Sequence, residues 1–223
     1  LEFKNIADSL AGVRLAKINV CQDTISADFE IDPRSISLQK VIKTSNAASR
    51  EMKDRDPSVQ FTAAMIKTGI TRELFCSSEG AMIDQSFPLT MGTITLSVQK
   101  GSACPEICYD YVGDLRGWEV IEGKNCYNVS FHDFSLERTK DTIELAGAEF
   151  LKTTKDEVVV VTDPHFNALL VHEIVGHPTE ADRALKMETA YAGRSWLFQS
   201  REKNQIEYRI ASSLVNAFSD PTK

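Results

Sequence analysis

The stretch 59–112 constrains the fold more than any other part of the chain, because short apolar stretches alternate with turn signals along it. In 90–100, Ile94, Leu96 and Val98 are two residues apart and would lie on one face of a strand. Short strands joined by short turns favour an antiparallel sheet. We therefore predict an antiparallel sheet from strands at 61–66, 71–77, 82–84 and 90–100, with Gly69 and 78–80 between them.

The flanking stretches predict helices and further strands. Apolar residues three and four positions apart indicate an amphipathic helix from Leu38 to Met52. A second helix is expected at 135–151. Weak alternation between residues 13 and 31 indicates short strands, and the four valines in 157–162 predict a strand buried on both faces.

The segment after these valines predicts a helix with unusual chemistry. Asp163 and Pro164 are typical of a helix start, as an N-cap and a first helical residue. Gly176 and Pro178 are stop signals. Between them lies His172-Glu173-Ile174-Val175-Gly176-His177. Thr179 is expected to cap a following helix.

Two histidines with a glutamate directly after the first form a zinc-hydrolase pattern. Imidazole nitrogens bind Zn²⁺, and the carboxylate accepts a proton from the attacking water. His172 and His177 are therefore candidate zinc ligands, and Glu173 is the candidate general base. The alternative is coincidence, with a core histidine beside a surface acid. The apolar surroundings favour a metal, because buried polar side chains need partners.

The spacing of five residues is unusual for one metal. On an ideal α-helix it places the two histidines about 140° apart. A π-bulge would bring positions i and i+5 onto one face. Alternatively, the helix ends at Gly176, and His177 approaches from a non-helical backbone. We predict a break or bulge at 175–177.

These elements predict a mixed α/β (α+β) fold. An antiparallel β-rich region, residues 1–130, contains one long helix. The start of a catalytic strand–helix region, residues 131–223, carries the metal-binding residues.

Composition restricts the partners. A net charge of −7 and the lack of a long Lys/Arg cluster argue against nucleic acid and anionic membranes. The longest apolar runs are too short to cross a bilayer. Five cysteines, an odd number with scattered spacing, indicate a reducing, cytoplasmic setting rather than a disulfide framework.

Several other polar residues are weaker candidates for functional roles. Glu180 and Asp182 either orient or bind a metal ligand, or they are acids in the first turn of a helix. Cys104 and Cys108 form a C-x3-C pair and are expected to be ordinary cysteines, with a second metal or redox site as the alternative. A surface role is expected for His165, and His132 receives no role. Structural pairing is expected for Tyr191 and Arg194, with contact to a substrate carboxylate or the oxyanion as the alternative.

The stretches 158–164 and 169–182 resemble the TldD/PmbA metallopeptidases, in which a His-Glu-x-x-x-His helix is followed by Glu-x-Asp. Residues 191–196 and the Ser-Glu-Gly turn at 78–80 are also similar to that family, and the likeness extends from about residue 35 to Lys223. The resemblance implies a zinc-dependent endopeptidase for short or unfolded peptides, working in a closed dimeric chamber. It also implies His172 and His177 as ligands, Glu173 as base, and a homodimer or a related non-catalytic partner subunit.

One feature departs from that family. Its third zinc ligand is a cysteine well after the helix, and no cysteine follows His177 here. We expect this ligand beyond Lys223. Two other functions stay open: a non-catalytic scaffold or regulatory subunit of such a complex, and a metal hydrolase of non-peptide amides.

Overall fold

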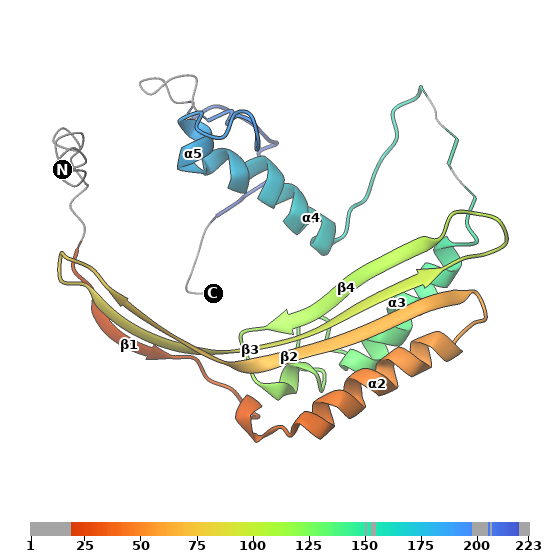
Figure 1. Ribbon diagram of the computed structural model, residues 1–223. Helices are drawn as coiled ribbons and strands as arrows, with labels where there is room; N and C mark the ends of the chain where they lie inside the picture. The colour runs from red at the N-terminus through yellow and green to blue at the C-terminus, as the bar shows by residue number, and fades with distance from the viewer. Residues whose placement is uncertain (1–18, 150, 153–154, 198–204, 206, 219–223) are drawn as a thin grey trace. The chain divides into compact units, whose positions relative to one another are not determined.

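The computed structural model describes residues 19–149, 151–152, 155–197, 205 and 207–218. The chain forms two compact units, 1–151 and 152–223, which are described separately (Figure 1). The division falls further along the chain than the predicted boundary near residue 130, because the helix that follows residue 130 packs on the first unit. Helices and strands are mixed, as predicted.

A curved four-stranded sheet forms the first unit. It contains β1 (Gln22–Ser26), β2 (Val59–Cys76), β3 (Met82–Val98) and β4 (Glu106–Asp114). β2 pairs antiparallel with β3 along its length, and β4 pairs antiparallel with the second half of β3. The antiparallel prediction is therefore confirmed for these three strands. β1 is the exception, because it pairs parallel with residues 82–86 of β3.

β2 and β3 are each one long strand where the sequence predicts two shorter ones. Gly69 lies opposite Leu89, and pairing continues on both sides of it. Pro88 is tolerated within β3 because it falls between the residues that pair with β1 and those that pair with β4. The predicted turn at 78–80 is confirmed, and Gly80 supplies its positive φ of 99°.

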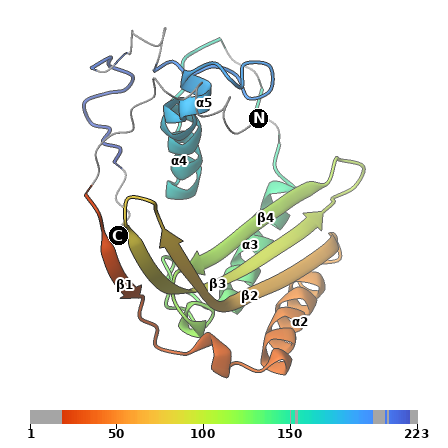
Figure 2. The same cartoon turned by 60° about the vertical axis from the view of Figure 1, so that its left-hand side comes forward.

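Two helices cover one face of this sheet (Figure 2). The first, α2 (Leu38–Asp54), is confirmed and begins where the Ser37 hydroxyl accepts a hydrogen bond from the Lys40 amide. The second, α3 (Phe131–Leu145), begins four residues before the predicted start and ends before the predicted 151. Ser130 sets the earlier start, because its side chain caps the helix.

The core lies between these helices and the sheet. At one point the ring of Phe131 packs directly on the backbone of Gly92, where an added Cβ would lie 2.4 Å from the ring. The other buried apolar residues of this core are Ala48, Met52, Val59, Ile94, Leu96, Val98, Val112, Trp118, Ile121 and Phe134.

A buried carboxylate joins two distant segments of this unit. The Glu119 side chain, in the 3₁₀ turn η2 (Trp118–Val120), accepts hydrogen bonds from the amides of Glu30, Ile31 and Gly117 at 3.1, 2.9 and 2.9 Å. Burial disfavours its charge, but backbone hydrogen bonds outweigh burial and lower the pKa of Glu119. Glu119 thus fixes residues 30–31 against the end of the sheet.

The N-terminal strand predictions are only partly testable. Residues 1–18 lie outside the described residues, so the expected strands there have no structural counterpart to compare. β1 confirms one short strand, whereas Phe29 and Ile31 lie in no strand. The Glu119 carboxylate takes the amide of Ile31 that a ladder would use.

The second unit contains short helical elements. They are α4 (Pro164–Val171), a π-helical turn η3 (His172–Gly176), a 3₁₀ turn η4 (His177–Thr179) and α5 (Ala181–Ala184). The predicted buried strand at 157–162 is wrong: Val158–Val161 form no strand, and Val159 is 95% exposed. The described part of this unit offers no strand with which they could pair. Across the described residues, no helix has the length and apolar character needed to cross a membrane.

Candidate metal centre

The helix start that precedes the candidate site is confirmed. The Asp163 carboxylate accepts a hydrogen bond from the Phe166 amide at 2.7 Å, and Pro164 is the first residue of α4. α4 has no buried residue, and His172 and Glu173 are exposed. Their apolar neighbours therefore do not bury these two side chains, and the expectation that burial favours a metal here is wrong. The distances and the local backbone indicate a metal site instead.

The two histidines are brought together by a π-helical turn. The amide of His177 donates to the carbonyl of His172, five residues earlier, and η3 spans His172–Gly176. This confirms the predicted distortion and selects the π-bulge over a helix that ends at Gly176. Gly176 has helical dihedral angles, with φ −58° and ψ −65°, so the glycine does not stop the helix.

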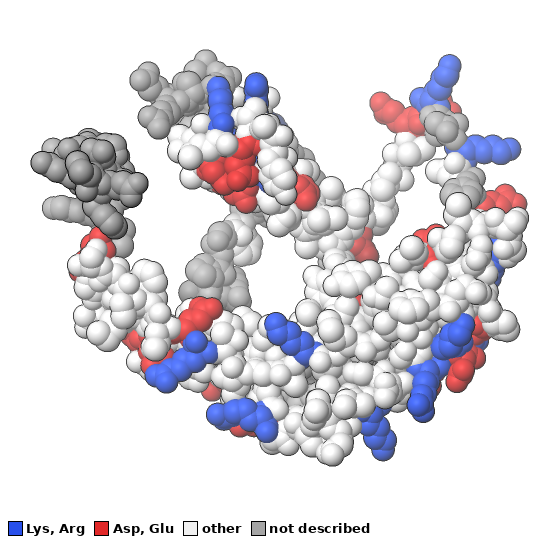
Figure 3. All heavy atoms as spheres, viewed as in Figure 1, with Lys and Arg blue, Asp and Glu red and all other residues white. Residues whose placement is uncertain are grey.

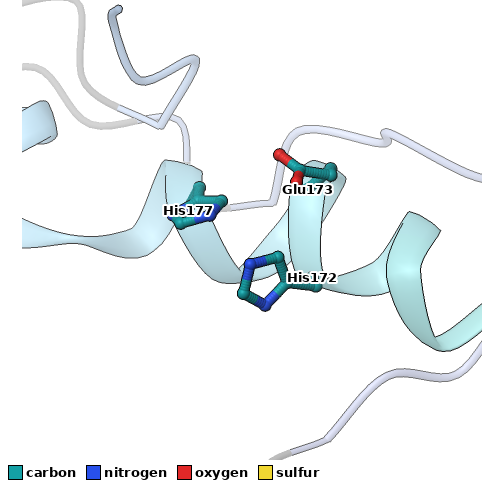
Figure 4. A group of neighbouring side chains, drawn as sticks. All are labelled: His172, Glu173 and His177. Carbon is teal, nitrogen blue, oxygen red and sulfur yellow. The ribbon is translucent and has the colours of Figure 1, made fainter. Parts of the chain in front are cut away.

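The turn places three potential ligand side chains in one group (Figure 4). One ligand atom from each of His172, Glu173 and His177 lies within 4.8 Å of the others. The two imidazole centroids are 4.3 Å apart and the rings nearly perpendicular, at 80°. His172 and Glu173 are exposed and His177 is half-buried, so the group is accessible to water.

The donor set fits zinc in kind and nearly in spacing. Two nitrogen ligands of a tetrahedral zinc lie about 3.4 Å apart, since each bond is about 2.1 Å. A spread of up to 4.8 Å is looser than that, and side-chain rotation on an exposed turn can close it. Imidazole and carboxylate groups are the usual ligands of zinc sites open to water.

A proline and a tryptophan explain why the π turn is tolerated here. In an α-helix the carbonyl of Ile174 would accept a hydrogen bond from residue 178, but Pro178 has no N–H. The indole of Trp196 supplies the missing donor, with Nε1 2.9 Å from that oxygen. The Ser195 hydroxyl donates to the Pro178 carbonyl. Residues 195–196 therefore hold this turn from outside the helix.

Thr179 does not have its predicted role. Its hydroxyl donates back to the Gly176 carbonyl at 2.8 Å instead of capping the next helix. The N-cap of α5 is Glu180, whose side chain makes no capping hydrogen bond.

Of the two acids after the motif, Glu180 lies beside a candidate ligand. Its Oε1 is 3.1 Å from Nδ1 of His177, and its Oε2 is 2.7 Å from Nε of Arg183. Asp182 instead accepts a hydrogen bond from the Arg183 amide. Sequence reasoning missed Arg183 and the role of Trp196. The i, i+3 spacing of Arg183 from Glu180 and the proline four residues after Ile174 are the signals that indicate them.

An apolar pocket of about 590 Å³ lies beside the same helix. Its lining combines residues of α4 and η3 with a later segment: Asn167, Leu170, Val171, Ile174, Val175, Ile210, Ala211, Val215 and Ala217.

The remaining candidates lie outside the trio. Cys104 is exposed and Cys108 half-buried, both are free thiols, and both belong to the first unit. Burial raises the pKa of the Cys108 thiol, which disfavours the reactive thiolate. His132 pairs with Glu51 of α2, with 2.6 Å between Nε2 and Oε2. His165, Tyr191 and Arg194 are exposed.

No family model and no curated protein matches the chain. The resemblance to the TldD/PmbA metallopeptidases therefore stays a prediction from the motif residues.

Proposed function

We propose that this protein is a zinc-dependent metallopeptidase of the TldD/PmbA kind, which hydrolyses short or unfolded peptides. One observation carries the proposal: the π turn gathers His172, Glu173 and His177, although the histidines are five residues apart. Without that turn, the same sequence would place the two imidazoles about 140° apart on a helix.

The three residues have separate roles in this proposal. His172 and His177 would hold the zinc through imidazole nitrogens. When bound, zinc supplies a hydroxide nucleophile at neutral pH, because it lowers the pKa of water from 15.7 to about 7. Glu173 accepts the proton of the attacking water and passes it to the leaving amine nitrogen. The exposure of Glu173 supports this role, since a base must reach the substrate.

A catalytic zinc normally has three protein ligands and one water. Within the described residues, only His172, Glu173 and His177 form a group that can hold a metal. If Glu173 is the base, two histidines remain as ligands. We therefore propose that a residue outside this trio completes the site.

The small number of protein ligands also favours a second candidate function. If Glu173 is itself a zinc ligand, no base remains in the group. The protein would then be a non-catalytic scaffold or regulatory subunit of a TldD/PmbA-type complex, with a structural zinc.

The proposal includes a cytoplasmic peptidase that works as a homodimer or with a related non-catalytic subunit. Free cysteines support a reducing compartment. Val159 and Val161 of the second unit are highly exposed apolar residues. Such residues are typical of a surface that another protein covers, which supports a partner subunit. On the visible face of the first unit, Lys and Arg are interspersed with Asp and Glu (Figure 3). With a net charge of −7, this supports a peptide partner rather than nucleic acid or an anionic membrane.

The test combines metal content with peptide cleavage. Zinc per chain is measured by mass spectrometry for the unmodified protein and for Glu173→Ala, and cleavage is followed on a panel of unfolded peptides. We expect both proteins to hold zinc and only Glu173→Ala to lose peptide cleavage. His165→Ala removes an exposed histidine of the same helix and is the matched control.

Two outcomes contradict the peptidase function. Zinc binding without cleavage of any peptide favours the scaffold. Cleavage that persists in Glu173→Ala rules out this glutamate as the base.

A further inference from the structure

We propose that Glu180 and Arg183 are positioning residues for His177, and that they form a chain Arg183–Glu180–His177 that holds the imidazole ready for a metal. This inference rests on the proposed function, since it concerns the same site. It adds two residues that act through a ligand and do not touch substrate.

The Glu180 carboxylate is held at both oxygens. Oε1 lies 3.1 Å from Nδ1 of His177, and Oε2 lies 2.7 Å from Nε of Arg183. The Arg183 side chain is 20% exposed and that of His177 is 24% exposed, so water screens these contacts only in part. Because Arg183 holds one oxygen of this carboxylate in place, the second oxygen stays beside the imidazole of His177.

Burial determines which nitrogen of His177 remains for a metal. Nδ1 of His177 and Nε of Arg183 are both buried atoms without an aligned hydrogen bond. Each has a Glu180 oxygen at ion-pair distance, so this carboxylate is their compensating group. With Nδ1 enclosed beside Glu180, Nε2 is the nitrogen left to bind a metal. Metal-binding histidines commonly have their second nitrogen fixed by a carboxylate in this way.

The backbone places the three residues in register. Glu180 is three residues after His177, and its amide donates to the His177 carbonyl at 3.1 Å. Arg183 is three residues further, in α5. Glu180 links η4 to α5 with an extended backbone, at φ −65° and ψ 131°, and its carboxylate lies beside both His177 and Arg183. Glu180 occupies the N-cap position of α5 but caps no amide, so its carboxylate is free to serve His177.

Zinc affinity of the full chain, measured by competition with a chelating dye, tests the chain of contacts. Glu180→Ala is expected to weaken zinc binding by about tenfold or more, the usual effect of losing such a partner. Arg183→Met is expected to weaken it less, and Arg183→Lys to restore most of the loss because it keeps the cation. Glu157→Ala removes an exposed carboxylate of the same unit and is expected to leave the affinity unchanged.

A second readout separates positioning from folding. The visible absorption spectrum of the Co²⁺-loaded protein reports ligand geometry, and we expect it to change in Glu180→Ala. The metal-free Glu180→Ala protein is expected to unfold at a lower temperature than Glu157→Ala, because two buried atoms lose their carboxylate, and to remain folded at the temperature of the zinc titration.

Three outcomes overturn the inference. Glu180→Ala and Glu157→Ala bind zinc equally, or zinc affinity falls in Glu180→Ala while the Co²⁺ spectrum stays unchanged, or Arg183→Lys binds no better than Arg183→Met. If the unmodified protein binds zinc and cleaves peptides through Glu173, such a result removes the positioning roles alone. If the unmodified protein binds no zinc, the proposed function fails as well.

Discussion

The indole Nε1 of Trp196 lies 2.9 Å from the carbonyl oxygen of Ile174, within the turn that brings His172 and His177 together. Pro178, four residues after Ile174, has no N–H for that oxygen. A side chain far along the chain therefore replaces a helical hydrogen bond at the point where the helix widens. The geometry of the candidate site depends on this contact as well as on its own residues.

Replacing Trp196 by Phe tests that dependence. The variant keeps an aromatic ring and loses the donor, which costs about 1 kcal/mol for a typical hydrogen bond. We expect zinc affinity to fall by about fivefold, since a looser turn separates the histidines. Dye competition measures the change. Tyr191→Phe, at a fully exposed aromatic residue, is the control, and equal affinity in both variants would contradict the role of Trp196.

In the first unit, Gly92→Ala is expected to destabilise the fold. Its Cβ would lie 2.4 Å from the ring of Phe131, and the core must shift to accommodate it. Overpacking of this kind costs about 1–3 kcal/mol. Gly69→Ala, on the neighbouring strand, meets no atom within 4 Å and is the matched control. Urea denaturation measures both, and equal stabilities would show that the ring does not pack on Gly92.

Glu119 predicts a specific pH dependence of stability. Its pKa is lowered in the folded protein from the ordinary value of 4.5. The unfolded chain therefore binds more protons between the two pKa values, and stability is lost as the pH falls below about 4.5. Glu119→Gln removes this titration and is expected to lower stability by about 1–3 kcal/mol at pH 7, because three backbone amides lose a charged acceptor.

The measurement is the free energy of unfolding at pH 7 and at about pH 3 for both proteins, because a carboxyl with the ordinary pKa of 4.5 is ionised in the unfolded chain at the first pH and protonated at the second. Other carboxylates titrate in both, so the difference between the two proteins isolates Glu119. The prediction would be contradicted if the two proteins differed in free energy of unfolding by the same amount at both pH values.

Local signals predicted the elements that depend on neighbouring residues. The amphipathic spacing gave α2, and Asp163 with Pro164 gave the start of α4. The distortion at the histidines followed from helical geometry alone, because an ideal helix cannot place residues five apart on one face. The candidate site was therefore predictable as a set of residues.

Features that depend on distant contacts were not predictable. β2 passes through Gly69 because β3 pairs with it on both sides, and Gly69 alone favours a break. The valines at 158–161 have the composition of a buried strand, but a strand forms only beside a partner. The acceptor role of Glu119 depends on amides of residues 30 and 31, far away in the sequence.

X-ray absorption at the zinc edge of the zinc-loaded full chain shows whether the π turn builds a metal site. We expect scattering from two imidazoles with nitrogens at about 2.0–2.1 Å, and from one imidazole in His177→Ala. A zinc environment without two imidazoles, or one that is unchanged in His177→Ala, would show that the π turn does not build a metal site.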